Sequence, residues 1–119
     1  MTIVYERPRA GAYIVDEPAT RLSRESGQVT GGDYDAGTVL GKVTASGHYT
    51  QWQPNASDGS EVACAILYKR TKADEPMPAL FTIALTAVNG KLLQWPEGVT
   101  EAQLQQATAQ LRQQFIRIV

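Results

Sequence analysis

The residue types that most often carry out catalysis or hold a metal ion are scarce in this chain. Its 119 residues include one histidine, His48, and one cysteine, Cys64. A structural zinc site needs about four nitrogen or sulfur ligands, which one histidine and one cysteine cannot supply. A serine–histidine–acid triad would need His48 as its base, and the sequence has no Gly-x-Ser-x-Gly turn to present a nucleophile. His48 follows the turn-forming residues Ala45-Ser46-Gly47, so we expect it to be a hydrated turn residue.

Carboxylate pairs and glycine-rich loops offer no better candidate for catalysis. Gly31-Gly32 is not followed by Lys-Ser/Thr and opens no predicted helix, so it lacks the features of a phosphate-binding loop. The acids that could form a glycosidase pair all lie in predicted loops or at strand edges, where acidic side chains usually interact only with water: Asp58, Glu61, Asp74 and Glu75. We therefore expect no catalytic residue, no metal, no cofactor and no small-molecule substrate, in a protein that is not an enzyme.

Charge and hydropathy argue against two further classes of partner. The net charge is −1 and neither half of the chain is strongly basic, so the sequence lacks the cations that neutralise nucleic-acid phosphates. No apolar run approaches the roughly 18 residues of a membrane helix. Residues 1–10 contain Glu6, Arg7 and Arg9 and so lack the apolar core of a signal peptide. We expect neither nucleic acid nor a membrane as a partner, and a protein made and used without secretion.

The remaining distinctive side chains are expected to pack in or beside the core. Cys64 lies in the apolar run Val62-Ala63-Cys64-Ala65-Ile66-Leu67, where a buried thiol acts as a small hydrophobic side chain. Trp52 and Trp95 fall at the ends of predicted strands. Core or rim packing is the default for such large residues, and anchoring an interface is the alternative, because tryptophan is enriched among interface hot spots.

The composition of the chain changes near residue 36. Residues 1–36 contain only short apolar clusters, such as Ile3-Val4-Tyr5 and Tyr13-Ile14-Val15, among prolines, glycines, serines and charges. No helical or alternating period lasts for two turns, and glycine or proline interrupts every candidate element. This pattern predicts an extended N-terminal arm over residues 1–36 that forms at most one or two short strands when it has a partner.

The body, residues 37–119, shows the patterns of β-structure and one helix. Strands are predicted at residues 38–43, 49–52, 62–68 and 80–88, with a surface loop at residues 69–78 and a tight hairpin at Asn89-Gly90.

The helix is specified by local signals. Thr100 can cap it and Gln103 can complete a capping box; Leu104, Ala107, Leu111 and Phe115 recur on one face. It is expected to end near Gln114, before a terminal strand over residues 116–119. The fold class is therefore α+β, mostly β, with one amphipathic C-terminal helix.

The size of the body favours an oligomer. A core of this length has a small margin over conformational entropy, and no disulfide or metal supports it. Oligomerisation is the remaining common source of stability, so a homo-oligomer is expected, although the argument gives no number of subunits.

From Leu22 onward the sequence resembles the lambda-type phage head decoration protein family. The resemblance begins with Leu22-Ser23-Arg24-Glu25-Ser26-Gly27 and continues through Ala36-Gly37-Thr38-Val39-Leu40-Gly41-Lys42-Val43. It then includes the loop Ala56-Ser57-Asp58-Gly59-Ser60-Glu61 and a C-terminal part from Leu93-Gln94-Trp95-Pro96-Glu97 to Phe115-Ile116-Arg117-Ile118-Val119. The order and spacing of these segments carry the resemblance, which covers about four-fifths of the chain. Residues 1–21 do not follow the family pattern.

The resemblance implies a structural protein made in the cytoplasm of a host bacterium and bound outside the expanded capsid. It implies a small barrel-like body of the β-tulip kind, a homotrimer, and an arm that orders on the major capsid protein and cements the shell against the pressure of packaged DNA. The arm residues that we expect to contact the capsid are Tyr13, Ile14, Val15, Arg21, Leu22 and Arg24, and Trp52 and Trp95 are the interface candidates in the body. The alternative is a small ligand- or peptide-binding β module of a phage tail or adhesion complex.

Overall fold

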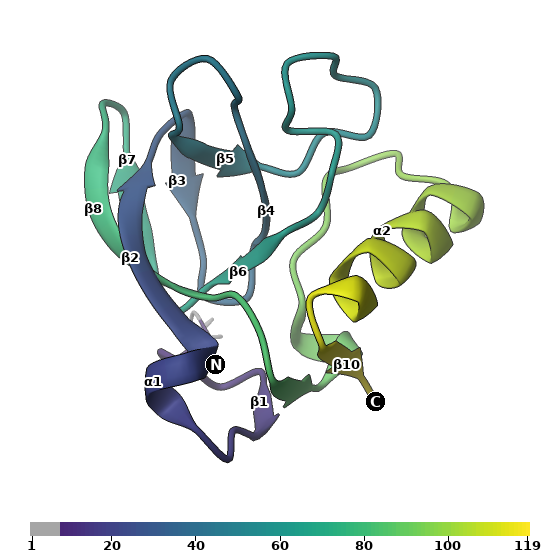
Figure 1. The fold of residues 1–119 in the computed structure, drawn as a ribbon. Coiled ribbons are helices and arrows are strands. Elements are labelled where there is room, and N and C mark those ends of the chain that lie inside the picture. The colour runs from purple at the N-terminus through teal and green to yellow at the C-terminus, as the bar shows by residue number, and fades with distance from the viewer. Residues whose placement is uncertain (1–7) are drawn as a thin grey trace, which may run out of the picture.

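A barrel of five short strands forms the centre of the computed structural model, which describes residues 8–119 (Figure 1). In ring order the strands are β2 (Arg24–Val29), β5 (Tyr49–Gln51), β4 (Val39–Lys42), β6 (Ala65–Leu67) and β8 (Met77–Thr82). The longest pairing joins β2 and β8 antiparallel, from Arg24 opposite Thr82 to Val29 opposite Met77. The ring closes where Val29 of β2 pairs in parallel with Tyr49 of β5. The mostly β fold with a barrel-like body is confirmed.

Two smaller sheets and a helix pack around this barrel. One sheet has the order β1 (Ile14–Asp16), β9 (Thr86–Val88) and β10 (Ile116–Ile118), with β1 antiparallel and β10 parallel to β9. The other pairs β3 (Gly32–Tyr34) with β7 (Thr71–Ala73). Helix α2 (Glu101–Gln113) packs against β10, and two short helices, α1 (Thr20–Ser23) and η1 (Gly90–Leu92), lie in connections. In Figure 1, α1, β1 and β10 lie at one end of the molecule, and the β4–β5 and β7–β8 turns lie at the other.

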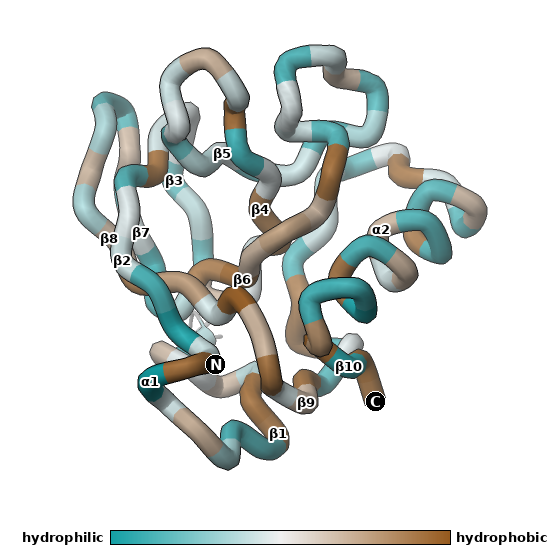
Figure 2. Tube along the Cα trace, in the orientation of Figure 1, coloured by the Kyte–Doolittle hydropathy of each residue, from teal (hydrophilic) through white to brown (hydrophobic). Residues whose placement is uncertain are grey.

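Two hydrophobic clusters lie on opposite sides of β4 and β6, and this explains why these strands are apolar and buried up to the exposed Lys42 that ends β4. On β4, Val39 points into one cluster and Leu40 into the other; on β6, Ile66 and Leu67 alternate in the same way. Figure 2 shows the resulting hydrophobic colouring of the central strands and the hydrophilic outer side of α2. The outer core, beneath α2, contains Tyr13, Val39, Trp52, Ala63, Ile66, Val88, Leu93, Ala107, Leu111 and Ile116. The inner core, inside the barrel, contains Val29, Leu40, Tyr49, Ala65, Leu67, Ala73 and Phe81.

The C-terminal helix forms where the sequence predicts it. The Thr100 hydroxyl accepts a hydrogen bond from the Gln103 backbone N–H, and the Gln103 side-chain oxygen accepts one from the Thr100 N–H, which completes the capping box. Ala107 and Leu111 are buried against the outer core. The prediction that Phe115 continues this buried face is wrong, because the helix ends at Gln113 and Phe115 lies beyond it in a solvent-exposed position. The terminal strand is confirmed as β10.

The boundary predicted at residue 36 needs correction for the part of the arm that the structure describes. Tyr13 is only 1% exposed and belongs to the outer core, and β2 supplies one wall of the barrel. The sequence of β2, Arg24–Val29, has one large apolar residue, Val29, which is why its pattern does not indicate a strand. Its backbone pairs with β8 on one side along its full length, so main-chain hydrogen bonds hold it in place. The part of the expected arm in residues 1–7 lies outside the described residues.

The turn predicted at Asn89-Gly90 has a different geometry. Asn89 has φ −84°, which is incompatible with a type I′ hairpin, and its side chain accepts a hydrogen bond from the Lys91 N–H to start η1. The chain enters a short 3₁₀ turn here because β9 pairs with β1 and β10 and not with the residues that follow.

Two other predicted segments are divided differently in the structure. The strand expected over residues 80–88 is split between β8 and β9, with a bend at Leu85, whose φ is +51°. The surface loop expected over residues 69–78 contains β7 and the first residues of β8. Pro78 is tolerated there because β6 pairs only with Phe81 and Thr82 of β8, so Pro78 has a paired barrel strand, β2, on one side only.

Tyr13 provides a test of whether this part of the chain is held by the body. Its hydroxyl donates to the Ile66 carbonyl oxygen at 3.3 Å and shares a hydrogen bond of 2.7 Å with the Thr82 hydroxyl. Tyr13→Phe leaves the buried Thr82 hydroxyl without this partner, so we expect a loss of about 1–3 kcal/mol in the free energy of unfolding, measured by urea denaturation. Val15→Ala, at an exposed neighbouring position, is the control and should change stability little. Equal stability of the Tyr13 variant and the parent protein would mean that this contact is not formed.

Candidate functional site

The six arm residues expected to contact a partner are placed in two different environments. Tyr13 is buried, and burial raises the pKa of its hydroxyl group; Ile14 is half-buried against the outer core. Val15, Arg21 and Leu22 are exposed, with Leu22 64% exposed on α1. The structure therefore leaves Val15, Arg21 and Leu22 accessible to a partner, whereas the Tyr13 side chain packs in the outer core.

Arg24 is held by groups within the same chain. Its guanidinium donates two hydrogen bonds to the Glu17 carboxylate, at 2.8 and 2.6 Å, and lies 4.4 Å from the centre of the Tyr68 ring. Ser23 adds a third donor to Glu17 at 2.6 Å. The hydrogen bonds from Arg24, then that from Ser23, lower the pKa of Glu17, although burial opposes this. The same pairing raises the pKa of Arg24. This cluster fixes the chain between β1 and β2, so Arg24 is a structural residue here.

The two tryptophans of the body also differ in exposure. Trp52 is fully buried and its indole N–H donates to the Glu61 carbonyl oxygen at 2.9 Å. Trp95 is half-buried and packs edge-to-face on Trp52, with ring centres 5.7 Å apart. Trp52 therefore has the core role that its size suggests, and only Trp95 retains an accessible surface.

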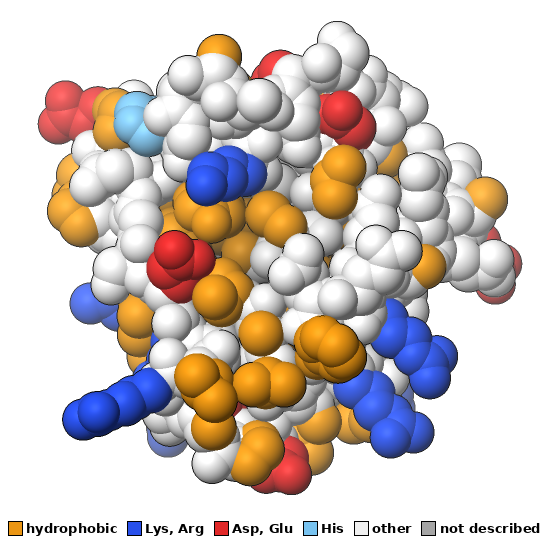
Figure 3. Space-filling model, viewed as in Figure 1, with side chains coloured by type: hydrophobic (Ala, Val, Ile, Leu, Met, Phe, Trp, Pro, Cys, Tyr) orange, Lys and Arg blue, Asp and Glu red, His pale blue; other side chains and the backbone are white. Residues whose placement is uncertain are grey.

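A set of exposed hydrophobic side chains gathers at one end of the molecule. Figure 3 shows them over the region of α1, β1 and β10. Soluble proteins expose single apolar residues routinely, whereas a group of them on one face is typical of an interaction surface. We call the exposed side chains of Val15, Leu22, Leu85, Phe115 and Val119 together the apolar face, in which Phe115 and Val119 lie at the two ends of β10.

Leu85 and Phe115 occupy equivalent positions in this face. Each directly precedes a strand, and those strands, β9 and β10, are parallel neighbours with Thr86 opposite Ile116. The Thr86 N–H donates to the Phe115 carbonyl oxygen at 3.2 Å. Among residues 8–119 they are the two non-glycine residues with positive φ, +51° and +61°, a conformation that costs a bulky L-residue roughly 1–2 kcal/mol. Sequence reasoning missed this pair; the absence of glycine where the helix ends was the available signal for Phe115.

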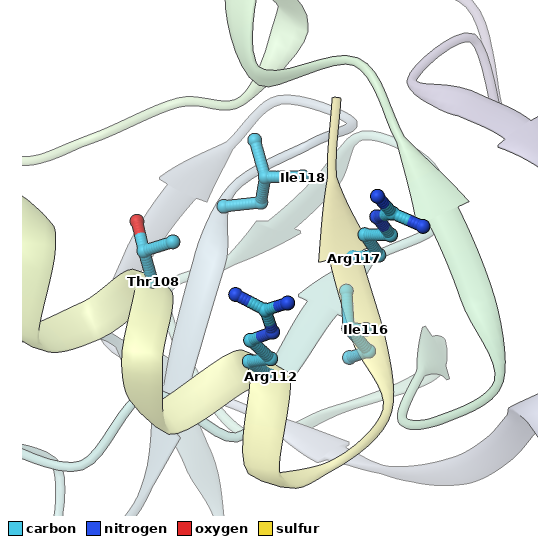
Figure 4. A pocket seen from close by; sticks show the side chains of 5 residues that line it. All are labelled: Thr108, Arg112, Ile116, Arg117 and Ile118. Carbon is cyan, nitrogen blue, oxygen red and sulfur yellow. The ribbon is translucent and has the colours of Figure 1, made fainter.

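A shallow cavity of about 190 Å³ adjoins the apolar face along β10. In Figure 4, Arg112 extends from the last turn of α2 on the side of Thr108 and Ile118, and Arg117 extends from the other side of the β10 strand. The Thr108 hydroxyl donates to the Leu104 carbonyl oxygen. The lining therefore offers cations and apolar groups, and neither a carboxylate nor an activated nucleophile.

Among the residues that the structure describes, there is neither an activated thiol nor a cluster of metal ligands. Cys64 is half-buried, and burial raises the pKa of its thiol to about 11, so the thiol is protonated at neutral pH. Within the described part of the chain, no group of three or more His, Cys, Asp or Glu side chains is placed to hold a metal ion. The helices of residues 8–119 are too short or too polar to cross a membrane.

Comparison with known proteins decides between the two functions considered for the sequence. The model of the family described as bacteriophage lambda head decoration protein D matches residues 3–116, so the expectation that residues 1–21 depart from the family pattern is wrong for residues 3–21. The chain belongs to this family. A comparison with curated proteins found no match. As a head decoration protein, it is a structural, non-enzymatic component of the virion that binds the exterior of the phage capsid and stabilises it. Family membership thus favours the decoration protein over the ligand-binding β module of a tail or adhesion complex.

We predict that His48 and Cys64, the single histidine and the single cysteine of the sequence, have no functional role in this decoration protein. His48→Ala changes a half-exposed turn residue and should alter stability by less than about 0.5 kcal/mol. Cys64→Ala removes one half-buried sulfur and should cost at most about 2 kcal/mol. Both variants should bind capsids as the parent does in a co-sedimentation assay. Loss of capsid binding by either variant while it remains folded would contradict this assignment.

The Glu17–Arg24 pair predicts a specific dependence of stability on pH. Because the folded protein lowers the pKa of Glu17 below its ordinary value of 4.5, the pair stabilises the fold fully above that pH, and its contribution is lost as the pH falls through the folded value. Thermal unfolding from pH 7 to pH 3 should therefore show a smaller decrease for Glu17→Gln than for the parent. Glu75→Gln, in the exposed β7–β8 turn, should keep the parent's slope. Parallel curves for the parent and Glu17→Gln would contradict the role of this pair.

Proposed function

We propose that this decoration protein acts as a homotrimer whose N-terminal arms bind the major capsid protein, while the barrel holds the three arms together. The observation that supports it most directly is the contrast within the N-terminal region. From Tyr13 onward the chain is fixed to the body by buried contacts, whereas the apolar cluster Ile3-Val4-Tyr5 precedes all of these anchors in the sequence.

The arm has the composition expected for strand addition to a partner. Apolar and polar residues show little alternation over residues 1–7, but this segment contains residues that favour β-strands and two charged side chains. An extended segment of this kind can pair with an exposed sheet edge, where main-chain hydrogen bonds provide affinity and alternate side chains provide fit. Ordering the segment on binding costs conformational entropy, so a single arm is expected to bind weakly, with a Kd on the order of 10 μM.

A trimer converts weak single contacts into stable attachment. If the effective concentration of a second tethered arm is about 1 mM, each further arm strengthens binding roughly 100-fold. Three arms then reach a Kd of about 1 nM. The small body, which has neither disulfide nor metal among its described residues, is also of the size for which association is a common source of stability.

The trimer can be tested by mass. Light scattering should give three times the chain mass of 13.0 kDa in dilute buffer, or on elution from capsids if trimers form only there. A stable dimer or hexamer would contradict the proposal.

The role of the arm can be tested by truncation. Deleting residues 1–7 removes the arm and keeps Tyr13 and β1, so the melting temperature and oligomeric state should stay close to those of the parent. Binding to expanded capsids should fall by at least about 100-fold, because each arm contributes to the combined affinity. A matched control replaces residues 1–7 with a Gly/Ser segment of equal length, which should bind as poorly as the deletion. Decoration at near-normal occupancy by the truncated protein would place the binding surface on the body alone.

A further inference from the structure

We propose that a groove beside Trp95, which we call the polar groove, binds a neutral pyranose sugar. The groove encloses about 320 Å³ and lies between β3, the residue before β4, the end of β5 and the segment that follows η1. That volume is at the lower end of the range for small-molecule sites. This inference goes beyond capsid binding, and it depends on neither the trimer nor the arm.

The first argument is the chemistry of the lining. The half-buried Trp95 ring lines the groove together with the side-chain amides of Gln51 and Gln94. Each sugar hydroxyl donates and accepts hydrogen bonds, and an amide offers both a donor and an acceptor. The C–H groups on the face of a pyranose carry partial positive charge and pack well against the negative face of an aromatic ring. An aromatic ring with amides beside it therefore suits a ligand that is polar at its rim and apolar on its faces.

The second argument is that the two amides keep their hydrogen-bonding capacity for a ligand. Gln51 and Gln94 are both half-buried, and neither side-chain amide is hydrogen-bonded to another group within residues 8–119. By contrast, the Thr38 hydroxyl, at the floor of the same groove, already donates to the Asp35 carbonyl oxygen at 2.7 Å. A bound sugar would give both amides partners that the fold itself does not supply.

The third argument is that both sides of the polar groove are fixed before a ligand arrives. The Gln94 N–H donates to the Gly37 carbonyl oxygen at 2.9 Å, and the Val39 N–H donates to the Gln94 carbonyl oxygen at 3.2 Å. The Trp95 ring packs edge-to-face on the buried Trp52 ring. A site held in this way loses little conformational entropy when it binds.

The charges and the hydropathy of the lining argue against other ligands. Among the described residues, the groove is lined by no Lys, Arg or His, so phosphates and acidic sugars would meet no cation there. It also lacks aliphatic hydrophobic side chains, which disfavours the apolar anchors of a peptide. The carboxylate of Asp33 accepts two hydrogen bonds from Arg70, at 3.1 and 2.8 Å, and this ion pair reduces its attraction for a basic peptide. A neutral sugar is the ligand class that remains.

The test is an NMR titration of the isotope-labelled full-length protein with three neutral trisaccharides, cellotriose, maltotriose and triacetylchitotriose. At least one should bind with a Kd on the order of 1 mM, as expected for a small ligand in an open groove. The signals of the Trp95 indole N–H and of the Gln51 and Gln94 side-chain amides should shift. The side-chain amide of Gln53, which is exposed and outside the groove, should not shift. If none of the three sugars moves the groove signals at about 10 mM, the proposal is overturned.

Substitutions test whether the groove residues make the contacts. The double variant Gln51→Ala/Gln94→Ala should bind the saccharide at least about tenfold more weakly, because it removes hydrogen bonds to the ligand. Its melting temperature and oligomeric state should stay close to those of the parent. Trp95→Ala should abolish binding, but it also removes a contact with Trp52, so the glutamine variant decides if Trp95→Ala does not fold. Gln53→Ala is the matched control and should bind as the parent does. Parent-like binding by the folded double variant would overturn the polar groove as the site.

Further probes test the class of ligand. Trigalacturonic acid, an acidic trisaccharide, should bind more weakly than the neutral sugars, and trilysine should leave the groove signals unchanged. Stronger binding of either probe than of every neutral trisaccharide would overturn the assignment. Loss of the parent's oligomeric state by the double variant, together with loss of sugar binding, would assign the groove to contacts between copies and also overturn it. Tighter binding of cellotriose than of glucose would indicate a glycan chain as the source of the sugar, and equal affinities a free sugar; either result supports the site.

Discussion

Strands β4 and β6 separate two hydrophobic clusters, and Val39–Gly41 of β4 and all of β6 are buried. Because Val39 and Leu40 point in opposite directions, one strand contributes to the packing under α2 and to the filling of the barrel. A small body gains from such a shared wall, since each buried strand serves two cores. Each of these two strands therefore stabilises both parts of the core.

Packing against the same core also determines where the N-terminal region becomes part of the body. Tyr13 fills the outer core and reaches the barrel through Thr82 and Ile66. The ion pair of Glu17 with Arg24 then directs the chain into β2. These contacts fix the chain from Gly11 onward to the body, where the Gly11 N–H donates to the Tyr68 carbonyl oxygen and the Asn89 N–H donates to the Tyr13 carbonyl oxygen.

The sequence predicts those parts of the fold that local signals specify. The cap formed by Thr100 and Gln103 and the apolar strand β6 both follow from short stretches of sequence. Strand β2 could not be predicted in this way, because its pairing with β8 joins residues far apart in the chain. Gly27 illustrates the point: a Cβ there would lie 2.7 Å from the Phe81 ring, a constraint visible only after folding. The apolar face was missed for the same reason, since β9–β10 pairing is what brings Leu85 and Phe115 together.

The anchoring of Tyr13 also determines how this protein carries mechanical load. A pull on the chain at Pro8 first meets the hydrogen bond from the Gly11 N–H to the Tyr68 carbonyl oxygen, 2.7 Å long, and then the buried Tyr13 ring. To extract that ring, tension must expose its buried surface and break its bonds to the barrel at the same time. The barrel behind it closes at β2 through one residue pair, Val29 with Tyr49, so the other residues of β2 are held by their pairing with β8. Tension applied at Pro8 would therefore meet the buried Tyr13 ring before it reaches the barrel strands.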